Sequence, residues 1–271
     1  MNSAAPEWTA RDLNDRVERG DRFFILDVRN RDEFERSRIE GRVPIPTTNV
    51  PYFEMLESAG DDDDLEAAVA RYVEASLSAE LPKGTPLLTV CAKGGTSRLV
   101  AGALRHLGYD VSNLAGGAAA WGDFYEARSV VTGNVNIAQI ARTARGCLSY
   151  LIDSGGSAAL IDPGRHVDEY LALAKRHNVN INLVIDTHAH ADHVSGGPAL
   201  ANRLGVPYHL HPYDAIHPID FLPATLDYTV LADRTRLAVG QAGIEIIWIP
   251  GHTLGSIALL IDGRYLLSGD S

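Results

Sequence analysis

Residues 181–193, I-N-L-V-I-D-T-H-A-H-A-D-H, decide how the second half of the chain folds. The run INLVID (181–186) has the apolar character of a buried strand. The turn after it carries four side chains of metal-ligating type: His188, His190, Asp192 and His193. Proteins that alternate strands and helices bind ligands at the carboxyl ends of their strands. We therefore predict a metal site on this turn, because such a cluster would be costly as a folding device alone.

Two later segments each place one further ligand at the end of a strand. His252 lies in W-I-P-G-H-T-L-G-S (248–256), which overlaps the end of the apolar run IEIIWI (244–249). Asp270 lies in Y-L-L-S-G-D (265–270), after another short strand. We predict that His252 and Asp270 belong to the same metal site as the turn.

Three more histidines in this half are predicted to have no metal role. His209, His211 and His217 occur in YHLHPYDAIHP (208–218), beside prolines and in a strand-to-loop region. Histidines in such a setting usually face solvent. We therefore expect all three to lie on the surface.

A β-hairpin is predicted upstream of the turn. CLSYLIDS (147–154) and AALID (158–162) alternate apolar and polar residues, and Gly155 and Gly156 lie between them. Cys147 lies among apolar neighbours of the first strand, which favours a place in the core. Because this strand series begins after a small-residue stretch around Trp121, we assign residues 1–128 and 129–271 to two domains.

The first domain is predicted to be a parallel sheet flanked by helices. The apolar runs FFILDV (23–28) and PLLTV (86–90) are typical of strands buried on both faces. Segments 65–77 and 98–108 have the apolar spacing of helices, so that strands and helices alternate. Thr9, with Asp12 three residues later, predicts the start of a further helix that ends at Gly20.

Cys91 is the predicted nucleophile of the first domain. It begins the segment C-A-K-G-G-T-S-R (91–98), between the end of a strand and the start of a helix. Backbone N–H groups at a helix N-terminus bind anions and lower the pKa of a thiol, and the thiolate is the reactive form. The predicted anion-binding loop is made of Lys93, Gly94, Gly95, Thr96, Ser97 and Arg98.

Composition limits the classes of function and partner. The formal net charge of -11 argues against a nucleic-acid partner, which requires a basic face. No apolar run approaches the roughly 20 residues of a membrane span, and the N-terminus lacks the layout of a signal peptide. Two cysteines are too few for a disulfide framework, so we expect free thiols and a cytoplasmic location. The oligomeric state is left open, with a homo-oligomer as one alternative.

Residues 8–126 resemble a rhodanese, a sulfurtransferase domain that carries sulfane sulfur on its loop cysteine. The resemblance rests on D-V-R (27–29), E-F (33–34), the Cys91 loop, and L-A-G-G (114–117) with Trp121. A related phosphatase loop would need an arginine six positions after the cysteine to bind phosphate, and that position is Ser97. Where many rhodaneses have a GHIPGA-like turn, this chain has a different segment, EGRVPIPTTNVPYFEML (40–56).

From about residue 133 onward the chain resembles the metallo-β-lactamase superfamily. The H-x-H-x-D-H, G-H-T and G-D elements occur in the order of that family, and Asp162-Pro163 after the hairpin fits as well. The resemblance implies a sandwich of two β-layers with helices outside. Only the first half of such a domain is covered here, and we expect the domain to continue beyond Ser271.

The resemblance implies two alternative metal sites. A persulfide dioxygenase would bind one Fe²⁺ through His188, His252 and Asp270, the two-histidine, one-carboxylate arrangement of non-haem iron oxygenases. His190, Asp192 and His193 would then orient ligands and bound water through hydrogen bonds. An enzyme of the glyoxalase II type would bind two Zn²⁺ instead. His188, His190 and His252 would hold one zinc, Asp192, His193 and a histidine beyond Ser271 would hold the other, and Asp270 would bridge them.

The two resemblances together favour a sulfur-metabolism enzyme. A domain that carries sulfane sulfur makes chemical sense beside one that oxidises it. We therefore expect oxidation of a low-molecular-weight persulfide by O₂ to sulfite, with glutathione persulfide as the expected substrate and Cys91 as the sulfur carrier. The alternatives are a zinc-dependent thioester hydrolase and a sulfur-carrier or docking module whose metal domain is inert.

Overall fold

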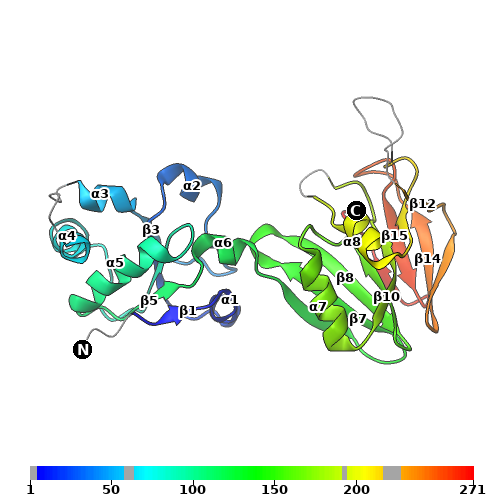
Figure 1. Cartoon of the computed structure of the whole chain (residues 1–271), viewed down its shortest axis with the longest axis horizontal. Helices are drawn as coiled ribbons and strands as arrows, with labels where there is room; N and C mark the ends of the chain where they lie inside the picture. Colours follow the sequence, from blue (N-terminus) through cyan, green and yellow to red (C-terminus); the bar gives the residue numbers. More distant parts are fainter. Residues whose placement is uncertain (1–4, 58–63, 191–193, 216–226) are drawn as a thin grey trace. The chain divides into compact units, whose positions relative to one another are not determined.

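The chain forms two compact units, residues 1–124 and 125–271, which are described separately. The structure is a computed structural model, and it describes residues 5–57, 64–190, 194–215 and 227–271. Figure 1 shows the elements of each unit. The boundary placed from the sequence, after residue 128, falls inside the strand β6 (Glu126–Val131), which belongs to the second unit.

The first unit is built on a five-stranded sheet in the order β1-β5-β4-β2-β3, and every neighbouring pair is parallel. Its strands are β1 (Glu7–Trp8), β2 (Phe24–Asp27), β3 (Thr47–Asn49), β4 (Leu87–Val90) and β5 (Val111–Leu114). Its helices are α1 (Ala10–Arg19), α2 (Arg31–Arg36), α3 (Tyr52–Leu56), α4 (Leu65–Tyr72), a π-helical turn η1 (Val73–Leu77), α5 (Gly95–His106) and α6 (Gly117–Gly122). The parallel sheet and the flanking helices confirm the predicted fold class.

The helix predicted after Thr9 is α1, and its caps explain its length. The Thr9 hydroxyl accepts a hydrogen bond from the Asp12 backbone N–H, and the Asp12 carboxylate accepts one from the Thr9 backbone N–H. Gly20 ends the helix with a left-handed conformation, φ 70°. Both ends of α1 therefore agree with the sequence prediction.

The second unit contains a seven-stranded sheet in the order β12-β11-β10-β9-β8-β7-β6 and a four-stranded sheet in the order β13-β14-β15-β16. The larger sheet is antiparallel from β6 to β9 and parallel from β9 to β12. Its remaining strands are β7 (Asn136–Arg142), β8 (Cys147–Ser154), β9 (Ser157–Ile161), β10 (Asn180–Ile185), β11 (Tyr208–Leu210) and β12 (Thr229–Val230), and a short 3₁₀ turn, η2 (Thr143–Arg145), joins β7 to β8. The smaller sheet contains β13 (Arg236–Val239), β14 (Ala242–Trp248), β15 (Ile257–Ile261) and β16 (Tyr265–Leu267).

Alternation along the strands of the larger sheet builds two cores. Along β9, Ala158 and Leu160 pack with the helices α7 (Val167–His177) and α8 (Gly197–Leu204), while Ala159 and Ile161 pack against the four-stranded sheet. Successive side chains of a strand point to opposite faces, so both faces of this sheet must be covered. The layers are helices, large sheet and small sheet (Figure 1), as the resemblance to the metallo-β-lactamase superfamily implied.

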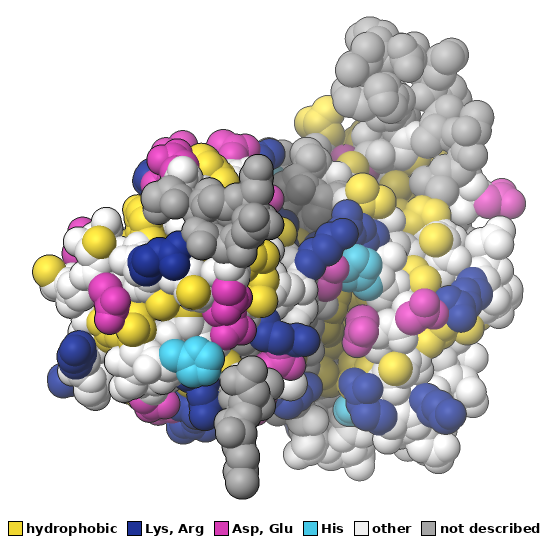
Figure 2. Space-filling model, turned by 60° about the vertical axis from the view of Figure 1, so that its left-hand side comes forward, with side chains coloured by type: hydrophobic (Ala, Val, Ile, Leu, Met, Phe, Trp, Pro, Cys, Tyr) yellow, Lys and Arg dark blue, Asp and Glu magenta, His cyan; other side chains and the backbone are white. Residues whose placement is uncertain are grey.

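In the view of Figure 2, acidic and basic side chains are interspersed on both units. Within the described ranges, no helix is both long enough and apolar enough to cross a membrane.

Candidate functional site

The turn that follows β10 brings one of its histidines together with the two distant ligands. The side-chain donor atoms of His188, His252 and Asp270 all lie within 4.8 Å of one another. His188 Nε2 is 3.8 Å from Asp270 Oδ2, and His252 Nε2 is 4.0 Å from the same oxygen. These separations are too long for hydrogen bonds. They suit ligand atoms that share one metal ion, because each metal–ligand bond is about 2.0–2.2 Å long. Asp192 and His193 lie outside the described residues.

The hydrogen bonds of His188 fix which of its nitrogens carries the proton. Thr187 Oγ1 donates to Asp162 Oδ2 at 2.8 Å, so it can only accept from His188 Nδ1, which lies 2.9 Å away. The proton therefore sits on Nδ1, and the lone pair of Nε2 faces His252 and Asp270. His188 Nε2 is buried and has no hydrogen-bond partner among the described residues. A metal ion would satisfy this atom, so the residues fit a metal site.

The charge state of His188 also suits a metal ligand. Burial lowers the pKa of His188, and the neighbouring His190 lowers it further. The neutral imidazole is the form that coordinates a metal. His188 is 2% exposed, whereas the side chains of His252 and Asp270 are 45% and 62% exposed, so one side of the triad is open.

His190 is directed to a different group. Its Nε2 lies 3.3 Å from Asp162 Oδ1, and Asp162, Asp186 and His190 form a second group whose donor atoms lie within 4.8 Å of one another. Burial and the charge of Asp162 raise the pKa of Asp186 to about 7. The Asp186 carboxylate accepts hydrogen bonds from Ser195 Oγ and the Tyr208 hydroxyl. The two groups are neighbours, because the ring centroids of His188 and His190 lie 4.1 Å apart.

Asp214 ties the turn at His188 to the loop that carries His252. Its Oδ2 accepts from the Ala189 backbone N–H at 2.8 Å and from Thr253 Oγ1 at 2.6 Å, and its Oδ1 accepts from the Gly255 N–H at 2.8 Å. A Cβ added at Gly255 would lie only 2.4 Å from Asp214 Cγ, which explains the glycine there. The Asp214 carboxylate thus fixes the position of the His188 turn relative to the loop that carries His252.

We expect Asp214→Ala to weaken metal binding without removing a ligand. Losing the bridge lets the His188 and His252 loops move independently, and changes to groups that orient ligands typically cost about 10- to 100-fold in affinity. The measurement is metal affinity by competition with a chelator. Asp214→Asn, which keeps an acceptor oxygen on the same side chain, should lose less. Equal affinity in the alanine variant and the wild type would contradict this role.

The two described histidines predicted to face solvent are buried, so that prediction is wrong for them. His209 and His211 are 4% and 6% exposed. His209 lies in β11 between Tyr208 and Leu210, which pack with the helices, so its ring points to the opposite face of the sheet. The ring of His211 stacks on Trp248, with centroids 5.7 Å apart. His217 lies outside the described residues.

In the first unit, Cys91 lies where β4 ends and α5 begins, as predicted. The Gly94 backbone N–H donates to Cys91 Sγ at 3.1 Å, and Ser97 Oγ lies 3.2 Å from the same sulfur. Burial alone raises the pKa of the Cys91 thiol, but hydrogen bonds from the Ser97 hydroxyl and from the backbone N–H groups of Ser97, Lys93 and Gly94 outweigh it and lower the pKa. The loop therefore stabilises a thiolate.

The small residues that follow β5 pack closely against the backbone of the Cys91 loop and hydrogen-bond to it. Ala118 N–H donates to Cys91 O, and Ala119 N–H donates to Ala92 O. A Cβ at Gly117 would lie 2.2 Å from Cys91 O, and Gly117 also has φ +60°, so only glycine fits. Arg98, predicted as part of the anion-binding loop, directs its guanidinium to Glu7 at 2.8 Å.

We expect Ser97→Ala to raise the pKa of Cys91. The Ser97 hydroxyl makes the largest of the contributions that lower this pKa, so without it the thiolate forms only at higher pH. The pH–rate profile of Cys91 alkylation by iodoacetamide should move to higher pH. Thr96→Ala, which removes the neighbouring hydroxyl of the same loop, is the control. An unshifted profile for the Ser97 variant would rule out this role.

Three residues around the metal site were not singled out from the sequence. These are Thr187, Asp186 and Asp214, which act through hydrogen bonds to other residues. A single threonine or aspartate matches no sequence motif, so the sequence did not indicate their roles. Asp162 has the one local signal: it precedes a proline at the end of a strand, and the structure gives it a positive φ of 50°. A non-glycine residue in that conformation marks a site where the surroundings impose strain.

Family models match both halves of the chain. The rhodanese-like domain matches residues 9–123, and the metallo-beta-lactamase superfamily matches residues 142–271. The hydroxyacylglutathione hydrolase of Anaeromyxobacter dehalogenans (strain 2CP-C) is 42% identical over 123 residues, which are 45% of this chain and 45% of that protein. The hydroxyacylglutathione hydrolase of Halorhodospira halophila (strain DSM 244 / SL1) is 32% identical over 136 residues, 50% of this chain and 46% of that protein. The chain therefore spans less than half the length of these curated relatives.

Solved structures resemble part of the chain. A metallo-beta-lactamase from Staphylococcus aureus subsp. aureus COL has a TM-score of 0.44 and 25% identity, covering 51% of this chain and 42% of that chain. The structure of ETHE1 from Myxococcus xanthus has a TM-score of 0.41 and 24% identity, covering 54% and 57%. Together with the parallel sheet around Cys91 and the layered unit around His188, the family matches identify the chain as a rhodanese-like domain followed by a domain of the metallo-beta-lactamase superfamily.

Proposed function

We propose that this protein oxidises a low-molecular-weight persulfide with O₂ to sulfite, and that its rhodanese-like domain transfers the sulfane sulfur. One observation carries the proposal. A cysteine loop that stabilises a thiolate and a cluster of two histidines and one aspartate occur in the same chain. The first arrangement suits sulfur transfer, and the second is the ligand set of non-haem iron oxygenases.

The proposed sulfur transfer uses the Cys91 thiolate as the nucleophile. Its sulfur attacks the outer sulfur of a donor R–S–S⁻, the S–S bond of the donor breaks, and R–S⁻ leaves with the electron pair. Cys91 then carries a persulfide. Attack by an acceptor thiolate on the outer sulfur reverses these roles and releases a new persulfide. The N–H of Gly94 and the Ser97 hydroxyl, both within 3.2 Å of Cys91 Sγ, would stabilise the thiolate each time it re-forms.

The proposed oxidation takes place at His188, His252 and Asp270. Bound by these three side chains, a ferrous ion would supply open coordination positions for O₂ and a persulfide. The chain's own contribution is orientation. Asp162 and Thr187 keep the proton of His188 on Nδ1, and Asp214 keeps the His188 and His252 loops together. One persulfide, one O₂ and one water balance to one thiol and one sulfite, with the sulfane sulfur oxidised and O₂ reduced.

The experiment measures metal content and oxygen uptake on anaerobically purified protein. One iron per chain and one O₂ consumed per sulfite formed from glutathione persulfide are the expected results. Folded protein without bound metal would instead support a sulfur-carrier or docking module.

Thioester hydrolysis with zinc is the second candidate, and the names of the curated relatives favour it. In that reaction the His190, Asp192 and His193 side chains would also be ligands. Two zinc ions per chain, hydrolysis of a glutathione thioester and no oxygen uptake would support this candidate against the first. The contact with Asp162 uses only His190 Nε2, so Nδ1 can serve as a metal ligand and His190 is compatible with either alternative.

A further inference from the structure

The hydroxyl of Ser97 has one hydrogen and two acceptors within reach. Ser97 Oγ lies 3.2 Å from Cys91 Sγ and 2.6 Å from Asn113 Oδ1. An amide oxygen and a thiolate can only accept, so the hydroxyl donates to one of them at a time. Ser97 and Asn113 are both 0% exposed, so the choice between the two acceptors is made away from bulk solvent.

The orientation of the Asn113 amide is fixed by two acceptors on its other side. Asn113 Nδ2 donates to Glu7 Oε1 at 2.9 Å and to the Gly94 carbonyl oxygen at 3.2 Å. A carboxylate and a carbonyl oxygen cannot donate, so the amide nitrogen must face them and the amide oxygen must face Ser97. The hydrogen bond from Asn113 lowers the pKa of the Glu7 carboxyl, which stays ionised. Asn113 therefore presents an acceptor to the Ser97 hydroxyl.

These side chains meet because neighbouring elements of the first unit bring them to one place. Ser97 lies in the first turn of α5, and Asn113 lies in β5, opposite Glu7 of the paired strand β1. Val111 is two positions before Asn113 and packs in one core with residues of α5. Because side chains alternate along a strand, Asn113 shares that face of β5 and Ser112 points to the opposite face.

The charge on the Cys91 sulfur decides which acceptor receives the hydrogen. A neutral thiol or persulfide sulfur is a weak acceptor, so the closer amide oxygen of Asn113 wins. A thiolate is a charged acceptor and forms a stronger hydrogen bond, but Asn113 Oδ1 then stays buried without its donor. Among the residues that the structure describes, the Ser97 hydroxyl is the donor to that oxygen. Asn113 therefore opposes the stabilisation of the thiolate by Ser97.

We propose that Asn113 is a positioning residue that competes with Cys91 for the hydrogen of the Ser97 hydroxyl. The inference rests on the proposed function for the role of Cys91 as the nucleophile of sulfur transfer. Before attack, Cys91 Sγ is anionic and receives the hydrogen. Once Sγ is bonded to the transferred sulfur, which then carries the charge, the hydrogen returns to Asn113 Oδ1. A thiolate of higher pKa is the stronger nucleophile, so this competition keeps Cys91 reactive.

The charged side chains at the ends of β1, β2 and β4 and at the start of α5 do not take part in this exchange. They are one exposed lysine of the Cys91 loop and two ion pairs: Lys93, Asp27 with Arg29 at 2.7 Å, and Glu7 with Arg98 at 2.8 Å. Both pairs remain in variants of Asn113. A change in the pH dependence of Cys91 in such variants therefore reports on the Ser97 hydroxyl.

The experiment is the pH–rate profile of Cys91 alkylation by iodoacetamide, measured on the full chain without a sulfur donor. Asn113→Ala removes the competing acceptor, so the midpoint of the profile should move to lower pH by roughly one pH unit. The rate at high pH should fall about threefold, because a thiolate of lower pKa is a weaker nucleophile. Ser112→Ala, at the next position of β5, is the matched control and should keep both values.

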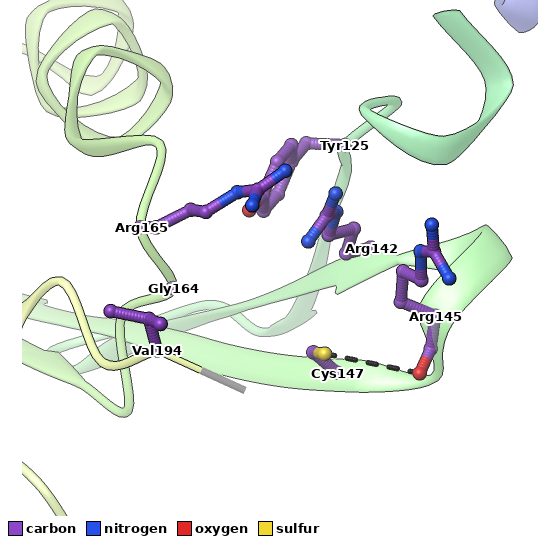
Figure 3. Close-up of a pocket in the computed structure, with 7 residues that line it drawn as sticks. All are labelled: Tyr125, Arg142, Arg145, Cys147, Gly164, Arg165 and Val194. Carbon is purple, nitrogen blue, oxygen red and sulfur yellow. Dashed lines mark hydrogen bonds between the residues drawn. The ribbon is translucent and has the colours of Figure 1, made fainter. Parts of the chain in front are cut away.

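Alkylation must be assigned to Cys91, because the second cysteine is also accessible. Cys147 is only partly buried and not in the core, which corrects the sequence prediction. It lines a cavity of the second unit, where its Sγ donates to Arg145 O at 3.8 Å (Figure 3). Peptide mass spectrometry separates the two thiols. Because no sulfur donor, metal or O₂ is used, the outcome is independent of whether the protein transfers sulfur or consumes oxygen.

The same change in a Ser97→Ala background separates the proposed role from a merely structural one. Because Asn113 acts through Ser97, Asn113→Ala should then leave the profile unaltered. Asn113 also binds the carbonyl oxygen of Gly94, whose N–H donates to Cys91. Loosening of Gly94 would move the midpoint to higher pH, with or without Ser97. A midpoint that rises or stays in place in Asn113→Ala, or a shift that persists without Ser97, would overturn the proposal.

Asn113→Asp is the second variant, which has the same shape and serves if the alanine variant does not fold. Its carboxylate keeps an oxygen toward Ser97 and holds the hydroxyl hydrogen more strongly. The midpoint should therefore move to higher pH, and the shift should be smaller in the Ser97→Ala background. No shift, or a shift of equal size in both backgrounds, contradicts a role that acts through Ser97.

Discussion

Cys91→Ser is expected to abolish the transfer of sulfane sulfur from thiosulfate to cyanide. The sulfur must be held as a persulfide on a thiolate, and a serine hydroxyl is neither ionised nor able to form that bond. Among the described residues, Cys91 is the cysteine that accepts hydrogen bonds from a helix-start backbone N–H and a buried hydroxyl. Steady-state assays of thiocyanate formation measure the loss, which should reach the level of the uncatalysed reaction.

Cys147→Ser is the matched control, because the chain has two cysteines and the second lies in the other unit. It should keep sulfur transfer close to the wild-type rate. Cys91→Ser should also leave the metal content unchanged, since Cys91 and the metal site lie in different units and share no contact partner in the described residues. Equal loss of transfer in both variants would refute the assignment of Cys91.

The features that the sequence predicted well are local ones. The strand before the turn at 187–193 and the capped helix after Thr9 are short patterns whose meaning does not depend on the rest of the chain. His188, His252 and Asp270 each follow a strand, which is a local signal. Because β10 belongs to the seven-stranded sheet and β14 and β16 to the four-stranded sheet, their meeting depends on how the two sheets pack.

Residues that act through long-range packing were not predictable in this way. Asp214 contacts Thr253, 39 positions away, and nothing in the local sequence indicates that pairing. His209 appeared to be a surface residue near a proline, but it lies on a strand whose two faces are both buried. Cys147 appeared to be a core residue because its neighbours are apolar, yet it is only partly buried, at the end of β8 that extends beyond the pairing with β9. Burial depends on what packs above a residue, which a pattern of neighbours does not contain.

His252→Ala or Asp270→Ala is expected to leave the metal site nearly empty. With one iron held by His188, His252 and Asp270, either change removes one of three protein ligands. Asp270 Oδ2 faces the Nε2 atoms of both histidines, at 3.8 Å and 4.0 Å, so its removal also takes away the negative charge that would balance the metal ion. Elemental analysis of anaerobically purified variants measures the loss, and oxygen uptake with glutathione persulfide should fall with it.

His190→Ala is the decisive comparison, because it separates one metal from two. In the single-iron alternative His190 orients Asp162, which binds Thr187 and so helps to position His188. Removing His190 should then keep most of the iron and reduce metal affinity or activity by about 10- to 100-fold. In the two-zinc alternative His190 is itself a ligand, and its loss should empty that zinc position as completely as the loss of His252 does. Iron retained in His190→Ala but lost in His252→Ala would favour the dioxygenase. Equal loss in both variants, with zinc bound and a thioester hydrolysed, would contradict the dioxygenase proposal. His190 would then be a metal ligand and not only a hydrogen-bond partner of Asp162.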